Sequence, residues 1–173
     1  AHHHRFLNRI ACIFNLFEKF VGVFRRTDNR HHVLFFKDKT ATVVGGGNTA
    51  LEDAVYLAGI CEKVYLIHRR DEFRGSRHEV EKVLANPKIE ILYDTIPLAI
   101  EGEGMVSRLQ VKNVKTEEEK TLYTSAVFVA VGLVPQNDIF AGKVDMDGGY
   151  IAAGESCVTN VPGVFVAGDT RTK

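Results

Sequence analysis

The stretch Thr42–Ala54, with the sequence TVVGGGNTALEDA, decides the fold of this chain. An apolar run stops at three glycines, and a helical pattern begins at once. Gly45, Gly47 and Ala50 match the spacing G-x-G-x-x-G/A, which is typical of turns that bind the pyrophosphate of a dinucleotide. The first glycine permits a tight turn, the second lets the pyrophosphate approach the backbone, and the small third residue lets helix and strand pack closely. The pyrophosphate would lie on the N–H groups at the helix N-terminus.

The glycine turn alone does not decide the function, because many glycine-rich turns simply join a strand to a helix. The segments on both sides of the turn support the dinucleotide-binding interpretation. A first strand is predicted within Phe35–Val44, after a polar turn at residues 37–39. A helix is predicted from Asn48 to Gly59, and a second apolar strand follows at Lys63–Ile67. Strand, turn, helix and strand in this order form a βαβ unit of the size that binds dinucleotides.

The stretch His68–Arg74, which follows the second strand, distinguishes between two dinucleotides. An NAD-binding unit usually has Asp or Glu at the strand end, where it accepts a hydrogen bond from the ribose 2′-hydroxyl. Here Arg69, Arg70 and Arg74 offer planar donors that suit phosphate. They predict a clamp for the 2′-phosphate of NADPH. The alternative is a solvated basic turn that pairs with the two carboxylates of the same stretch, and the preceding glycine turn favours the clamp.

Two segments, Val43–Ala54 and Val64–Arg74, resemble the NADPH domain of low-molecular-weight thioredoxin reductase. The resemblance runs from about Phe35 to the C-terminus and implies a Rossmann-like α/β fold with a parallel central sheet. The cofactor-binding residues expected from the motifs and from this resemblance are Gly45, Gly46, Gly47, Asn48, Thr49, Ala50, Glu52, His68, Arg69, Arg70, Arg74, Gly132 and Asp169.

Three of these assignments have plain structural alternatives. Glu52 would lie on the cofactor side of its helix by resemblance, but an acidic residue in the first turn also complements the helix dipole. Gly132 would line the nicotinamide groove, or would simply end a strand. Asp169 would contact the ribityl chain of FAD by resemblance, or would be a turn residue. No catalytic residue and no metal site are expected in this chain.

Further elements follow from the pattern of apolar residues. A helix is predicted from Asp71, which could cap it, to about Leu84. Ile89–Tyr93 alternates as a strand does, and segments 106–111 and 120–123 predict a small antiparallel hairpin. The continuous apolar run Ala126–Gly132 is typical of a buried parallel strand.

Residues 1–33 differ in character from the rest. Apolar residues at helical spacing between Phe6 and Phe24 predict an amphipathic helix that packs on its own domain or on a partner, in preference to a membrane surface. In thioredoxin reductases a Cys-x-x-Cys dithiol precedes the strand leading into the glycine motif. Asp28 and His31 stand at those positions here, and residues 1–33 contain no G-x-G-x-x-G for FAD. We therefore interpret 1–33 as an atypical extension, 34–134 as the NADPH domain and 135–173 as a fragment resembling the returning part of the FAD domain.

Composition excludes several classes of function. The chain has 173 residues with 22 basic and 22 acidic side chains, and this balance argues against nucleic acid as the main partner. No apolar run is long enough to span a membrane. The dispersed cysteines Cys12, Cys61 and Cys157 form neither a disulfide framework nor a zinc site, and they suit a reducing cytoplasm.

The expected function is the NADPH-binding part of a thioredoxin reductase-like flavoprotein. In the complete enzyme, the resemblance implies hydride transfer from NADPH to FAD and then reduction of a dithiol, with thioredoxin or another redox protein as partner and a homodimer as the usual assembly. This chain alone is not expected to be catalytically complete. The alternatives are a thioredoxin reductase-like ferredoxin–NADP reductase, which lacks the dithiol, and a non-catalytic NADPH-binding module.

Overall fold

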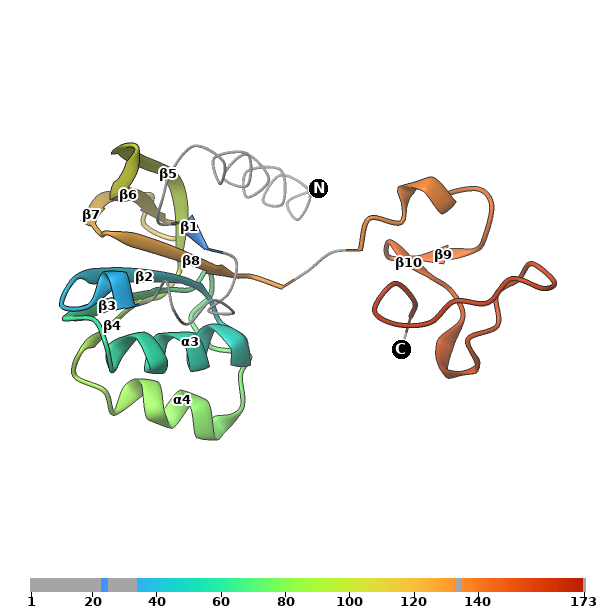
Figure 1. Ribbon diagram of the computed structural model, residues 1–173, viewed down its shortest axis with the longest axis horizontal. Helices are drawn as coiled ribbons and strands as arrows, with labels where there is room; N and C mark the ends of the chain where they lie inside the picture. Colours follow the sequence, from blue (N-terminus) through green and yellow to red (C-terminus); the bar gives the residue numbers. More distant parts are fainter. Residues whose placement is uncertain (1–22, 25–33, 133–134, 173) are drawn as a thin grey trace. The chain divides into compact units, whose positions relative to one another are not determined.

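The structure, a computed structural model, describes residues 23–24, 34–132 and 135–172 (Figure 1). The chain divides into two compact units, with the division between Val131 and Gly132. The first unit contains the glycine turn.

The centre of the first unit is a five-stranded sheet with the order β1-β8-β2-β3-β4, in which every neighbouring pair is parallel. Its strands are β1 (Val23–Phe24), β2 (Thr40–Gly45), β3 (Lys63–Ile67), β4 (Ile89–Leu92) and β8 (Ala126–Ala130). Both faces of this sheet are covered, which explains why β2 and β8 are nearly continuous apolar runs. The predicted parallel central sheet is therefore confirmed.

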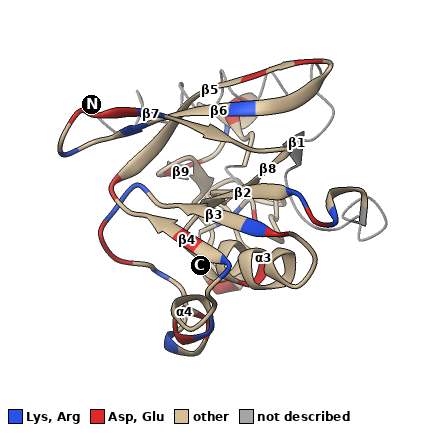
Figure 2. Ribbon diagram, turned by 90° about the vertical axis from the view of Figure 1, so that its left-hand side faces the viewer, with Lys and Arg blue, Asp and Glu red and all other residues tan. Residues whose placement is uncertain are grey.

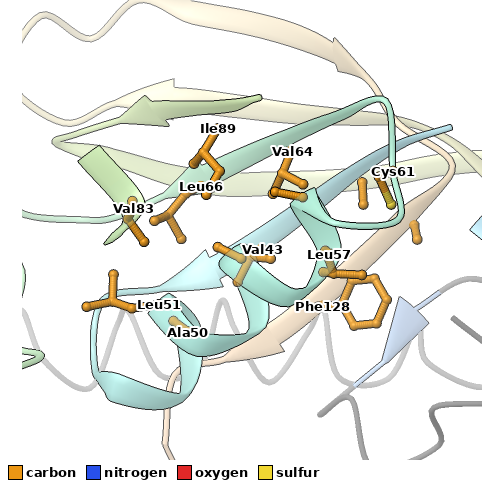
Figure 3. Packing of buried hydrophobic residues seen from close by; sticks show 14 of the residues in the cluster. Val43, Ala50, Leu51, Leu57, Cys61, Val64, Leu66, Val83, Ile89 and Phe128 are labelled. Atoms are coloured by element: carbon orange, nitrogen blue, oxygen red, sulfur yellow. The ribbon is translucent and has the colours of Figure 1, made fainter. Parts of the chain in front are cut away.

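Helices α3 (Asn48–Ala58) and α4 (Arg77–Leu84) lie on one face of the sheet (Figure 1). Apolar side chains of α3 reach across to β2, β3 and β8 (Figure 3). Leu51 and Leu57 are fully buried there, and the Phe128 ring packs edge-on against Phe36 with 6.4 Å between ring centroids. The helix predicted from Asn48 to Gly59 is confirmed, with Gly59 as its C-cap.

A three-stranded antiparallel sheet covers the opposite face. Its strands are β5 (Thr95–Glu103), β6 (Met105–Asn113) and β7 (Glu119–Tyr123). Buried residues of β5, β6 and β7 pack against the sheet residues Val44, Ile67, Val127 and Val129. The predicted hairpin is confirmed as β6 and β7, whereas β5 was not predicted.

β5 is irregular, which explains why its sequence pattern is weak. Its register against β6 shifts between Pro97 and Ala99 and again between Glu101 and Gly102. At Gly102 a Cβ would overlap the carbonyl oxygen of Met105, so the strand needs glycine there. A strand containing proline, glycine and two register shifts loses the strict alternation from which strands are recognised.

Three expected boundaries differ from the structure. The helix predicted from Asp71 begins only at Arg77, with Ser76 as its N-cap. The first strand begins at Thr40, because residues 34–36 form a 3₁₀ turn, η1 (Leu34–Phe36). Phe24, expected at the end of an amphipathic helix, lies in β1 and pairs with Phe128; the rest of that predicted helix lies outside the described residues.

The described residues of the second unit form short elements: η2 (Asp138–Phe140), β9 (Met146–Asp147), β10 (Tyr150–Ile151) and η3 (Gly154–Ser156). Polar contacts contribute much of its order. The buried Asn137 amide donates to the carbonyl oxygens of Gly149 at 3.0 Å and Thr170 at 2.9 Å, and Arg171 Nη1 donates to that of Gly154 at 2.6 Å. Within the described parts of both units, no helix has the length and apolar character that a membrane span requires.

Two leucine-to-alanine substitutions test the assignment of the core. Leu57→Ala in α3 should lower the free energy of unfolding by about 2–5 kcal/mol, because it empties a fully buried site. Leu84→Ala in α4 is the matched control, since this leucine is 61% exposed, and its effect should stay within about 0.5 kcal/mol. Urea unfolding followed by circular dichroism measures both. Equal losses would contradict the assignment of the α3 face as core.

Candidate functional site

The glycine turn joins the end of β2 to the start of α3 at the carboxyl edge of the parallel sheet. At Gly45 a Cβ would overlap the carbonyl oxygen of Ala130 and would lie 2.7 Å from the Cβ of Ala50. Strands β2 and β8 and helix α3 therefore pack closely at this point. A larger side chain would not fit at Gly45 or at Ala50. This is the close packing expected from the motif spacing.

Gly47 has the opposite surroundings. It is the N-cap of α3, no side chain caps this helix within the described part of the chain, and a Cβ at Gly47 would meet nothing within 4 Å. Asn48 and Thr49, the first residues of α3, are exposed. The positive end of the helix dipole therefore faces open space beside a backbone without side chains, which is the arrangement that accepts an anion.

Two hydrogen bonds link the segment 68–76, here called the arginine loop, to the glycine turn and the first residue of α3. The Arg74 N–H donates to the Gly46 carbonyl oxygen at 2.8 Å, and the Ser76 N–H donates to Asn48 Oδ1 at 2.6 Å. At Gly75 a Cβ would overlap Leu51 Cδ1, so the loop passes close over α3. These contacts give the loop its own path, which explains why α4 cannot begin at Asp71.

His68 supports the arginine loop from inside. It is only 7% exposed, and a Cβ at Gly46 would overlap its ring. Its Nε2–H donates to the Glu72 carbonyl oxygen at 2.9 Å. The ring centroid lies 5.4 Å from that of Phe73, which in turn lies 5.1 Å from that of Tyr93. His68 therefore packs between turn and loop, and its ring helps to position both.

The electrostatics of the arginine loop favour an anion. Burial lowers the pKa of His68, and the positive charges of Arg69, Arg70 and Arg74 lower it further, whereas the hydrogen bond to the Glu72 carbonyl oxygen raises it by less. Burial, and then Arg70 and Arg74, lower the pKa of Arg69. The positive charges of Arg70 and Arg74 therefore act on the Arg69 guanidinium group. Like charges gathered in this way are most favourable when an anion lies between them.

The carboxylate of Asp71 does not supply that anion. Its Oδ2 lies 2.9 Å from Lys115 Nζ in the turn between β6 and β7, and this ammonium group holds the pKa of Asp71 below its ordinary value. Figure 2 shows basic, acidic and basic segments in turn along the loop that enters α4. Arg70 and Arg74 are exposed, and Arg69 is half-buried.

The remaining predicted site residues lie elsewhere. Glu52 is exposed on α3. Gly132 and Asp169 belong to the second unit. Gly132 adopts φ +90°, a left-handed conformation that favours glycine, and Asp169 is exposed.

Sequence reasoning missed the residues that hold the loop in place. These residues make contacts between segments that are far apart in the chain, and no local sequence pattern predicts such contacts. They are Gly75, Ser76, Asp94 and Lys115.

The described residues include two free cysteines, the buried Cys61 and the partly exposed Cys157. No group of three or more His, Cys, Asp or Glu side chains there could hold a metal ion. Cys61 is buried in the core, and burial raises the pKa of its thiol to about 11, so it packs as a small apolar residue.

The comparisons with known proteins agree on one group of enzymes. Residues 18–173 match the family model described as pyridine nucleotide-disulphide oxidoreductase, so the match begins well before Phe35. The chain is 41% identical over 146 residues to thioredoxin reductase of Peptoclostridium acidaminophilum, covering 80% of this chain and 46% of the relative. It is 46% identical over 135 residues to thioredoxin reductase of Spironucleus barkhanus, covering 77% and 44%.

A solved structure gives the same result. The crystal structure of Lactococcus lactis thioredoxin reductase in the FR conformation matches with a TM-score of 0.79 and 30% identity, over 88% of this chain and 50% of that one. The chain thus spans about half the length of the curated relatives it matches. The chain belongs to the pyridine nucleotide-disulphide oxidoreductase family, and its homologues are thioredoxin reductases.

Proposed function

We propose that the first unit binds NADPH and serves as the pyridine-nucleotide domain of a thioredoxin reductase-like enzyme. The observation that carries this proposal is the attachment of the arginine loop to the glycine turn through the Arg74–Gly46 hydrogen bond. It brings two kinds of anion-binding element to one edge of the sheet, namely an uncapped helix N-terminus and a cluster of guanidinium groups. A dinucleotide with an additional 2′-phosphate carries anions for both.

Each element has a separate task in this proposal. The open backbone at Gly47 and the first N–H groups of α3 hold the pyrophosphate. The exposed Arg70 and Arg74, with the half-buried Arg69, hold the 2′-phosphate by charge-assisted hydrogen bonds. His68 is a positioning residue, because its ring packs between the turn and the loop. NADPH supplies the hydride when bound, and these residues fix where its nicotinamide is presented.

The described residues give much weaker support for an FAD-binding site than for an NADPH-binding site. Beyond Gly132, the helices among the described residues are three-residue 3₁₀ helices, and these provide no α-helix N-terminus for a flavin pyrophosphate. Asp169 would then be one contact in a flavin site of the complete enzyme. We assign 34–134 to NADPH binding, 135–173 to the FAD domain and 1–33 to an extension, with thioredoxin or another redox protein as the electron acceptor of the complete enzyme.

Titration of the full chain with NADP⁺ and NAD⁺ in parallel tests the phosphate clamp. The wild-type chain should prefer NADP⁺, and Arg70→Ala should weaken NADP⁺ by about tenfold or more while leaving NAD⁺ nearly unchanged, because it removes a partner of the 2′-phosphate alone. Arg77→Ala is the matched control: its side chain is 93% exposed and pairs with Glu81 on α4, and neither affinity should change. Equal affinities of the wild-type chain for both nucleotides would refute the proposal.

A pair of glycine substitutions separates binding from folding. Gly47→Ala should weaken NADP⁺ and NAD⁺ together, because its methyl group enters the open space that the shared pyrophosphate would use, and it should cost at most about 1 kcal/mol of stability. Gly46→Ala should instead lower stability by about 1–3 kcal/mol, because its methyl group overlaps the packed His68 ring. Calorimetric titration and thermal unfolding measure the two effects. Normal binding of both nucleotides by Gly47→Ala would remove the turn from the site.

A further inference from the structure

Lys115 lies in the turn between β6 and β7, yet its ammonium group contacts the arginine loop. Its Nζ is 2.9 Å from Asp71 Oδ2 and 2.9 Å from Asp94 Oδ2. Asp71 is a neighbour of Arg70 in the loop, and Asp94 lies between β4 and β5. One lysine thus joins two carboxylates that come from different segments of the chain.

Backbone hydrogen bonds make Asp94 the link between these segments. Its N–H donates to the Arg70 carbonyl oxygen at 3.1 Å, and its own carbonyl oxygen accepts from the Val114 N–H at 2.6 Å. The neighbouring Thr95 N–H donates to the His68 carbonyl oxygen at 2.9 Å. The first half of the arginine loop is therefore attached to the β4–β5 turn, and that turn is attached to the backbone beside Lys115.

The ion pair with Lys115 changes how the negative charge of Asp71 acts on an anion at the arginine loop. An Asp71 carboxylate that turned toward the guanidinium groups would compete with a phosphate for them and would repel the phosphate directly. Lys115 counters both effects, because its ammonium group neutralises the Asp71 carboxylate and holds its Oδ2 in an ion pair with the β6–β7 turn.

We propose that Lys115 is a positioning residue for NADP(H) specificity, which holds the Asp71 carboxylate in an ion pair so that it does not oppose the 2′-phosphate at the arginine loop. The inference rests on the proposed NADPH function and adds to it a residue outside the glycine and arginine motifs. It predicts an effect on discrimination between the two nucleotides rather than on dinucleotide binding in general.

The test measures the dissociation constants of NADP⁺ and NAD⁺ for the full chain at low salt, about 0.02 M, where exposed charges are least screened. Lys115→Met should weaken NADP⁺ by about threefold, the size expected for an exposed ion pair, with NAD⁺ unchanged. Lys115→Arg should keep the wild-type ratio. Asp71→Asn should have little effect alone, but should restore the ratio when combined with Lys115→Met, because no carboxylate then needs to be neutralised.

Lys120→Met is the matched control, because Lys120 is as exposed as Lys115, at 56% against 58%, and approaches Glu90 instead of Asp71. It should leave the ratio of affinities unchanged. Two results would overturn the inference while leaving the proposed function intact. One is that Lys115→Met leaves the ratio of the NADP⁺ and NAD⁺ dissociation constants unchanged, with or without weaker binding of both. The other is that Asp71→Asn does not restore this ratio in the double variant. A wild-type chain without preference for NADP⁺ would overturn both.

Discussion

The close approach of α3 to the end of β2 is the constraint on which the first unit depends. Gly45, Ala50 and the carbonyl oxygen of Ala130 meet at one point, where a single added methyl group would collide with backbone. This contact sets where α3 starts and how it lies over the sheet, so that Leu51 and Leu57 enter the core. It also leaves Gly47 at the open N-terminus of the helix. Packing and ligand access are thus determined by the same few residues.

The arginine loop adds a second layer of constraint on top of the first. It is held by the Gly46 and Glu72 carbonyl oxygens, by the buried His68 ring and by the exposed Asn48 side chain. The charges of Arg70 and Arg74, by contrast, act on the Arg69 guanidinium group and lower its pKa in addition to burial. A loop held in this way keeps like charges together without needing a counter-charge from its own carboxylates, since Asp71 is paired with Lys115.

The parts predictable from sequence are those whose physical cause is local. The glycine spacing, the apolar runs of β2, β3 and β8 and the periodicity of α3 each reflect one element and its nearest neighbours. The start of α4 was wrong because a tertiary bond from Ser76 to Asn48 overrides the capping potential of Asp71. Strand β5 could not be predicted because Pro97 and Gly102 interrupt its alternation. The ion pairs of Lys115 could not be predicted because its partners lie far away in sequence.

In the arginine loop, the contacts that fix the backbone conformation differ from the side chains that carry the positive charge. This difference affects how such a site changes during evolution. The contacts that fix the path use main-chain atoms and the side chains of His68 and Asn48, whereas the side chains of Arg70 and Arg74 are exposed. Exchanges at these exposed positions leave the supporting hydrogen bonds in place and carry little penalty in folding. Descendants of such a domain could therefore drift from one nicotinamide coenzyme to the other by a few surface replacements, with the scaffold inherited intact.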